Sequence, residues 1–260
     1  MGMLSLAIWT PIAFGLVLLA LGRDDRSLNH MTTRLRLALV TCVLFSASLF
    51  VVAQQLASKP GVHPLSGRRY AQPMSYLGAD WLDRSERVRE EQPDIALDAL
   101  AIAMGATMAD VGAGSGYMTA RLAKRVGPGG KVYANDIQPE MLAMLRERLT
   151  RERLTNVELV LGDDGNPNLP TGTLDLILMV DVYHEFSEPQ KMLRHMRAAL
   201  KPGGRLVLLE YRKEDPFVPI RLEHKMTVEE AKLEVEAEGF TLTKVDPLLP
   251  RQHILIFTRP

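Results

Sequence analysis

The chain has 260 residues, of which 47% are hydrophobic and 24% are charged, and its formal net charge is zero. This composition excludes a mostly disordered protein and fits one well-buried domain with a small appendage. The balanced charge offers no basic field, so we expect no nucleic-acid partner. The single cysteine, Cys42, lies in an apolar run, which excludes disulfides, thiolate metal clusters and a cysteine nucleophile in the folded domain.

The first 57 residues contain two uncharged apolar segments, 4–22 and 37–57. Each is close to the roughly 20 residues needed to cross a bilayer, so we predict that residues 1–57 are a membrane anchor. The alternative is a native start at Met31, with residues 1–30 an over-long start, followed by a signal sequence cleaved near Ala53 and export. Export would separate the rest of the chain from cytosolic cofactors, so we expect membrane association with a cytoplasmic domain.

Residues 58–75 carry prolines, glycines and serines without helical or strand periodicity, which predicts a linker. The folded domain is expected over residues 76–260. Its first part, 81–101, has the pattern of one or two helices that could lie across a ligand crevice. From residue 106 onward short apolar runs alternate with amphipathic runs, which is typical of a parallel sheet with helices on both faces.

Seven strands and four further helices are expected in this region. The last helix, 227–239, begins with a capping box formed by Thr227 and Glu230 and ends at Gly239. The last two strands are joined by a short connection, which predicts an antiparallel pair at the sheet edge. The strands are predicted over 107–112, 131–136, 157–162, 174–181, 204–211, 241–246 and 253–258, and the earlier helices over 117–126, 138–154 and 188–200.

The loop after the first strand, "GAGSG" at 112–116, has three glycines in five positions. Glycines let bare backbone approach a ligand, and the following helix directs its amino end to the same place. A dinucleotide site needs G-x-G-x-x-G, but the sixth position here is Tyr117. Asp136 follows Gly116 by twenty residues, where a carboxylate can accept both hydrogens of a ribose diol.

Five blocks in order resemble the class I S-adenosylmethionine-dependent methyltransferases. They are "ADVGAGSGYM" at 109–118, "ANDIQPEML" at 134–142, "VLGDD" at 160–164, "VDVYHEF" at 180–186 and "LKPGGRLVLLEYR" at 200–212. The resemblance covers roughly residues 76–260. It implies a Rossmann-like α/β fold with a seven-stranded, mostly parallel sheet, an antiparallel last strand and helices on both faces. It also implies S-adenosylmethionine as the cofactor and a small-molecule methyl acceptor.

The resemblance places the cofactor along the ends of four strands. The acid and the loop of the first strand surround the methionine part, and Asp136 binds the ribose with Ile137 and Gln138 beside the adenine. The third strand's acid meets the adenine amino group, and Asp181 lines cofactor and acceptor. The implied cofactor-binding residues are Asp110, Gly112, Ala113, Gly114, Gly116, Asp136, Ile137, Gln138, Asp163, Asp164 and Asp181.

The catalytic candidates are His184 and Tyr183, which follow the fourth strand. A histidine has a suitable pKa for a general base, although a structural role in packing or hydrogen bonding is the alternative. Glu210 and Tyr211 are expected to face the crevice, but no neighbouring acid and amide pair completes a divalent-ion site, so no metal is expected. His224 has the pattern of a solvated surface histidine.

The sequence therefore predicts a membrane-associated methyltransferase that acts at oxygen, carbon or nitrogen of a small acceptor. Anchoring at a bilayer favours a lipophilic acceptor. Two alternatives stay open: a non-catalytic module that binds the cofactor for sensing or assembly, and a nicotinamide oxidoreductase, which fits the fold but not the glycine spacing.

Overall fold

The computed structural model describes residues 61–260. The two apolar segments predicted to anchor the chain, and the cleavage site predicted near Ala53, lie outside the described residues. Within 61–260, no helix combines the length and the apolar composition needed to cross a bilayer.

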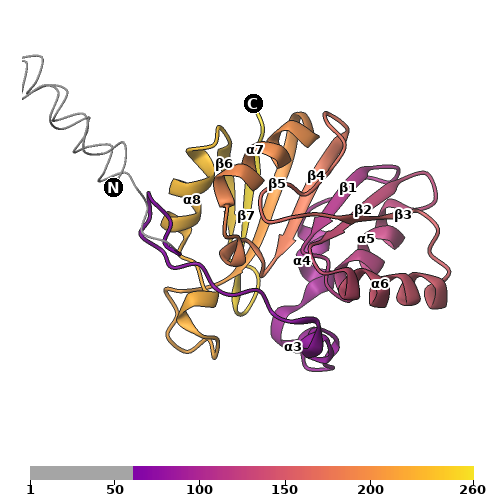
Figure 1. Cartoon of the computed structure of the whole chain (residues 1–260), viewed down its shortest axis with the longest axis horizontal. Helices are drawn as coiled ribbons and strands as arrows, with labels where there is room; N and C mark the ends of the chain where they lie inside the picture. The colour runs from indigo at the N-terminus through magenta and orange to yellow at the C-terminus, as the bar shows by residue number, and fades with distance from the viewer. Residues whose placement is uncertain (1–60) are drawn as a thin grey trace, which may run out of the picture. The chain divides into compact units, whose positions relative to one another are not determined.

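The core of the domain is one sheet of seven strands in the order β3-β2-β1-β4-β5-β7-β6 (Figure 1). Strands β1 to β5 are parallel, and β7 is antiparallel to both of its neighbours. This confirms the predicted sheet and its antiparallel last strand. The strands are β1 (Thr107–Val111), β2 (Lys131–Asp136), β3 (Val157–Leu161), β4 (Leu174–Val180), β5 (Leu200–Tyr211), β6 (Thr241–Asp246) and β7 (Gln252–Thr258).

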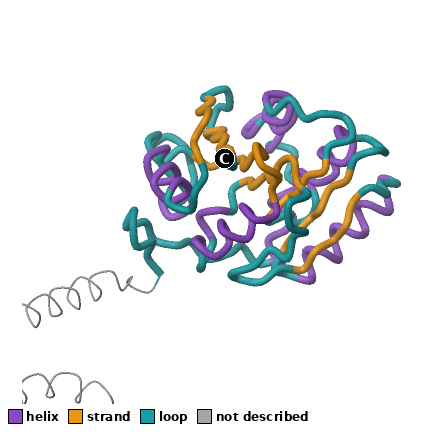
Figure 2. The backbone as a smooth tube through the Cα atoms, turned by 90° about the horizontal axis from the view of Figure 1, so that it is seen from above, coloured by secondary structure: helices purple, strands orange, loops and turns teal. Residues whose placement is uncertain are grey.

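Helices cover both faces of the sheet, as Figure 2 shows. Side chains of α4 and α5 bury one face, and α6 packs beside them over β2 and β3. Side chains of α7 and α8 bury the other face. The helical elements are η1 (Tyr76–Asp83), α3 (Arg87–Glu91), α4 (Pro93–Ala99), α5 (Tyr117–Val126), α6 (Pro139–Glu152), η2 (Tyr183–Glu185), α7 (Pro189–Ala199), η3 (Leu222–His224) and α8 (Val228–Glu236).

The helix ends follow the local sequence. Thr227 accepts a hydrogen bond from the backbone of Glu230, whose side chain accepts one from the backbone of Thr227, so the capping box of α8 is confirmed. Helices α6 and α7 begin with proline in their first turn. A backbone N–H at this position has no hydrogen-bond acceptor within the helix, so proline, which lacks the N–H, costs no hydrogen bond there. Helix α5 ends at Gly127, as the sequence predicts.

Residues 61–71, which the sequence assigns to a linker, are bound tightly to the domain. We call this segment the strap. Arg68 is buried and donates Nε and Nη2 to Glu234 of α8, at 3.1 and 2.9 Å. Its Nη1 donates to the carbonyl of His184 at 3.0 Å, and the amide of Ala71 donates to the same carbonyl. The strap therefore joins α8 to the segment that follows β4.

Candidate functional site

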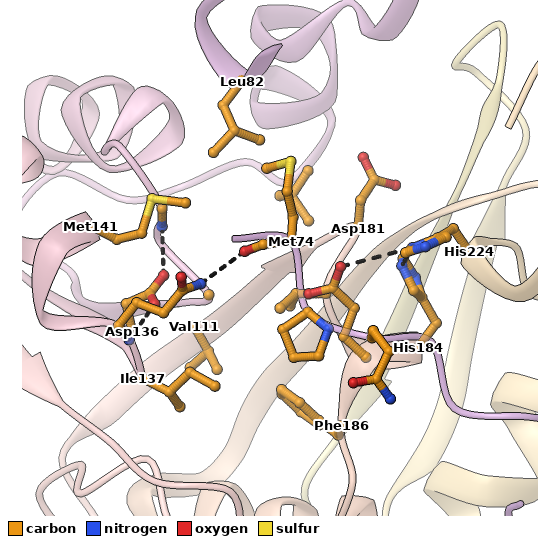
Figure 3. A pocket seen from close by; sticks show the side chains of 18 of the residues that line it. Met74, Leu82, Val111, Asp136, Ile137, Met141, Asp181, His184, Phe186 and His224 are labelled. Atoms are coloured by element: carbon orange, nitrogen blue, oxygen red, sulfur yellow. Dashed lines mark hydrogen bonds and ion pairs between the residues drawn. The ribbon is translucent and has the colours of Figure 1, made fainter. Parts of the chain in front are cut away.

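A cavity of about 730 Å³ lies at the carboxyl ends of the parallel strands. This is where open α/β sheets bind ligands, and the volume is in the range of small-molecule sites. Figure 3 shows Val111, Asp136, Ile137 and Met141 on one side of the cavity and Asp181, His184 and His224 on the other. The cavity is also lined by Met74, which precedes η1, and by Leu82, which lies in η1.

The glycine loop brings bare backbone to the cavity. A Cβ at Gly112 would lie 2.3 Å from Cγ2 of Val182, and one at Gly114 would lie 2.7 Å from Cδ1 of Leu82. Both glycines have positive φ and line the cavity. Gly116 does not line it: its missing Cβ makes room for Leu145 of α6, so this glycine serves the packing of the loop against α6.

Asp136, at the end of β2, is held in place by the loop and by the start of α6. One carboxylate oxygen accepts the amide of Gly114 and the other accepts the amide of Gln138, both at 2.9 Å. Burial raises the pKa of Asp136, and these backbone bonds oppose the rise. Each carboxylate oxygen has further lone pairs, so Asp136 can still accept hydrogen bonds from a diol in the cavity.

Gln138 has a role that the sequence did not indicate. Its amide nitrogen donates to the carbonyl of Met74 at 2.9 Å, and its oxygen accepts the amide of Tyr76 at 2.9 Å. The side chain therefore fastens the segment before η1 across the mouth of the cavity. Ile137 beside it is exposed and lines the cavity.

Replacing Gln138 by alanine is expected to expose the amide of Tyr76 to exchange. The variant removes the hydrogen bond that this amide donates to Gln138, worth about 1 kcal/mol, so hydrogen exchange at Tyr76 should accelerate about fivefold. Amide exchange followed by mass spectrometry or NMR on the full chain measures this. Glu140→Ala, an exposed change in the first turn of the same helix, is the matched control. Equal exchange at Tyr76 in both variants would contradict the fastening role.

The other predicted cofactor residues divide between the cavity wall and the layer behind it. Asp163 and Asp164, after β3, line the wall, and Asp163 also caps the turn at Gly165. Asp110 lies behind the loop and accepts the hydroxyl of Thr119 at 2.6 Å. Burial raises the pKa of Asp110 to about 6, and the bond from Thr119 opposes this. Ala113 is buried beside α6, outside the cavity lining.

Asp181, directly after β4, has one carboxylate oxygen in the cavity wall that lacks a hydrogen-bond partner among residues 61–260. One carboxylate oxygen accepts Nε2 of Gln252 at 2.7 Å, and the other is buried without a partner among residues 61–260. Burial, followed by the charges of Glu91 and Glu210, raises the pKa of Asp181 well above its usual value. A ligand that brings a hydrogen-bond donor or a positive charge would satisfy this oxygen.

Arg87 is a cavity residue that sequence reasoning missed. Its guanidinium donates to Glu91 at 2.6 Å and to the carbonyl of Leu82, and it lies 4.4 Å above the ring of Tyr117. Two other arginines, Arg84 and Arg89, occur in the same polar stretch of sequence, 81–92, so composition alone does not single out Arg87. It places a buried positive charge beside the glycine loop.

The two catalytic candidates lie in different surroundings. The Nδ1 of His184 is 2.6 Å from Glu210, which is fully buried, and its Nε2 is 3.1 Å from Nδ1 of His224. His184 and Glu185 both line the cavity. Burial raises the pKa of Glu185 to about 7. Tyr183 is fully buried in the core against Phe186 and lies outside the cavity lining, because η2 turns its side chain away.

Two further expectations need correction. Glu210 was expected to face the crevice, but its side chain is fully buried against His184 and lies outside the cavity lining. His224 was expected to be a solvated surface histidine, but it lines the cavity and contacts His184. Tyr211 lines the cavity as expected, with its hydroxyl bound to Glu91 at 2.9 Å. The connection between β5 and α8 contains η3, which brings His224 into contact with His184, forty positions earlier in the chain.

Comparison with known proteins agrees with this geometry. Residues 108–204 match the model of a family described as "Methyltransferase domain". A crystal structure of a SAM-dependent methyltransferase from Aquifex aeolicus matches 72% of this chain and 100% of its own, with a TM-score of 0.69 and 29% identity. These similarities support a class I S-adenosylmethionine-dependent methyltransferase.

The methyltransferase domain also has curated relatives of known name. The ubiquinone/menaquinone biosynthesis C-methyltransferases UbiE of Escherichia fergusonii and Salmonella arizonae are each 37% identical over 118 residues. The match covers 45% of this chain, and the chain spans about half the length of these relatives, at 47%. The [4+2]-cyclase SpnF shares the fold alone, with 17% identity and a TM-score of 0.56 over 65% of this chain and 80% of its own.

The residues present fit S-adenosylmethionine better than a dinucleotide. The cavity wall offers the carboxylates of Asp136 and Asp181, which suit hydroxyl and ammonium donors and would repel a pyrophosphate. Backbone at Gly112 and Gly114 leaves room for close approach, and the guanidinium of Arg87 can receive a carboxylate. The assignment of individual residues to parts of the cofactor stays a prediction.

Proposed function

We propose that this chain transfers a methyl group from S-adenosylmethionine to a small, lipophilic acceptor. The observation that carries the proposal is the carboxylate of Asp136, which faces the cavity beside the glycine loop at the end of β2. The methyl transfer is an in-line displacement in which the S–CH₃ bond breaks, its electron pair stays on the sulfur of S-adenosylhomocysteine, and the acceptor gains the methyl and releases a proton. Holding the two reactants in line supplies much of the acceleration.

The acceptor side of the cavity supports a lipophilic partner. Phe186 and Met192 line it together with Pro219 and Ile220 from the loop between β5 and α8. The UbiE relatives, named as C-methyltransferases of ubiquinone/menaquinone biosynthesis, support carbon as one acceptor atom. Oxygen and nitrogen acceptors stay within the proposal because the chain spans only about half of those relatives.

We also infer attachment of the chain to a membrane through residues 1–57, with the methyltransferase domain in the cytoplasm. The support is the sequence of segments 4–22 and 37–57, each uncharged and close to a bilayer in length. Attachment would keep the domain at the membrane, where lipophilic acceptors are dissolved, and in the compartment that supplies the cofactor.

The proposal is tested by methyl transfer into extracted membrane lipids. The full chain is incubated with S-adenosylmethionine that carries a labelled methyl group and with a total lipid and quinone extract. We expect label in the organic phase, and we expect much less with Asp136→Ala. Binding of S-adenosylhomocysteine without transfer to any fraction would instead favour the non-catalytic module. Absence of binding to a folded chain would overturn the cofactor assignment.

A further inference from the structure

Three possible metal ligands converge in the cavity wall on the acceptor side. They are Nε2 of His184, Nδ1 of His224 and a carboxylate oxygen of Glu185, and these atoms lie within 4.8 Å of one another. The two nitrogens are 3.1 Å apart, and the carboxylate of Glu185 is 3.8 Å from Nδ1 of His224. Ligands of a tetrahedral zinc ion at about 2.1 Å lie about 3.4 Å from one another, so these two separations are close to those of a zinc site.

Glu210 fixes which nitrogen of His184 is available. Its carboxylate lies 2.6 Å from Nδ1 and also accepts the amide of Tyr183 at 3.0 Å. A carboxylate at this distance keeps the proton on Nδ1, so Nε2 presents its lone pair to His224 and the cavity. Metal-binding histidines are commonly oriented by such a carboxylate behind them. The sequence hides this arrangement because Glu210 lies on β5 and His224 in the loop after it.

Charge supports a cation at the same place. Glu185 is largely buried and Glu210 fully buried, and their only ion-pair partners among residues 61–260 are His224 and His184. Lysine and arginine in that part of the chain lie beyond ion-pair distance of both carboxylates. A divalent cation bound between these side chains would stabilise the charged form of both buried carboxylates.

We propose that His184, Glu185 and His224 bind a divalent first-row transition-metal ion. Two imidazoles and one carboxylate suit zinc or iron(II), and such three-ligand sites leave positions open for another ligand. Those positions face the cavity, where an oxygen or nitrogen of the methyl acceptor would bind. The inference rests on the proposed function only in this last step, because the metal site itself is independent of the acceptor.

The test is a titration of the full chain, stripped with a chelator, with cobalt(II) and then zinc. The visible ligand-field bands of cobalt report nitrogen and oxygen ligands in a four- or five-coordinate site. We expect stoichiometric cobalt bands that zinc displaces. His224→Ala and Glu185→Gln should each weaken zinc binding by at least about tenfold. Even residues that only hydrogen-bond to metal ligands change metal affinity by about tenfold or more when they are replaced. His195→Ala, an exposed histidine of α7, should bind zinc like the wild type.

Two outcomes would overturn the site. One is the absence of cobalt bands from the wild-type chain, a result that needs no variant to fold. The other is equal zinc affinity in His224→Ala and His195→Ala. Titration of each sample with S-adenosylhomocysteine separates this inference from the proposed function. If the chain binds S-adenosylhomocysteine but no metal, the metal site alone is contradicted. If it binds metal but no S-adenosylhomocysteine, the cofactor assignment alone is contradicted.

Discussion

Replacing Glu234 by glutamine is expected to lower the free energy of unfolding by about 3–5 kcal/mol. Both Glu234 and Arg68 are buried, and the carboxylate accepts two hydrogen bonds from the guanidinium. Glutamine has nearly the same shape but no charge, so the variant leaves the Arg68 cation buried without its counter-ion. Urea unfolding of the full chain, followed by circular dichroism, measures the loss.

The control for this variant is Glu229→Gln, an exposed change near the start of the same helix, α8. It should change the stability little, because exposed ion pairs and surface substitutions have small effects. A double replacement, Arg68→Met with Glu234→Leu, should recover much of the loss, since apolar pairs of similar volume can replace buried ion pairs. Equal stability of Glu234→Gln and Glu229→Gln would contradict the structural role of the strap.

The strap matters for function because it holds the wall of the cavity. Arg68 joins Glu234 of α8 to the carbonyl of His184, and the side chain of His184 lies in the cavity. Arg68 supplies one of the two strap hydrogen bonds to this carbonyl, and Ala71 supplies the other. We infer that the strap fixes the backbone on which the acceptor side of the cavity depends.

The sheet could be predicted from the sequence because its central strands are buried on both faces. Such strands appear as continuous apolar runs, and "LDLILMV" of β4 and "RLVLLEY" of β5 are recognised by composition alone. The glycine loop and Asp136 could be placed because both follow strands of the parallel sheet, whose carboxyl ends meet at one edge. The order of the strands then brings residues 112–116 and 136 together.

The strap and the histidine cluster could not be predicted, because their partners are far apart in the sequence. Arg68 and Glu234 are separated by 166 residues, and the polar, proline-containing stretch around Arg68 has the composition of a linker. His224 follows an exposed loop, where a histidine is usually solvated. Only the path of the chain after β5 brings it within 3.1 Å of His184. Local periodicity carries no information about such contacts.

Replacing Asp136 by alanine is expected to weaken the binding of S-adenosylhomocysteine at least about tenfold, a loss of about 1.5–3 kcal/mol. The carboxylate is held by the amides of Gly114 and Gln138, so its free lone pairs are oriented toward the cavity before a ligand arrives. Calorimetric titration of the full chain measures the change. Asp98→Ala, an exposed aspartate of α4, is the matched control and should bind like the wild type.

A loss of affinity in Asp136→Ala has two possible causes, because the variant also frees the amide of Gly114 and could disturb the loop. A ligand that lacks the ribose hydroxyls separates them in a double cycle. If Asp136 accepts the diol, this ligand binds the wild type more weakly than S-adenosylhomocysteine does, and the alanine variant no longer distinguishes the two ligands. If the variant weakens both ligands equally, the carboxylate acts only on the loop, and the role of Asp136 as the ribose acceptor is contradicted.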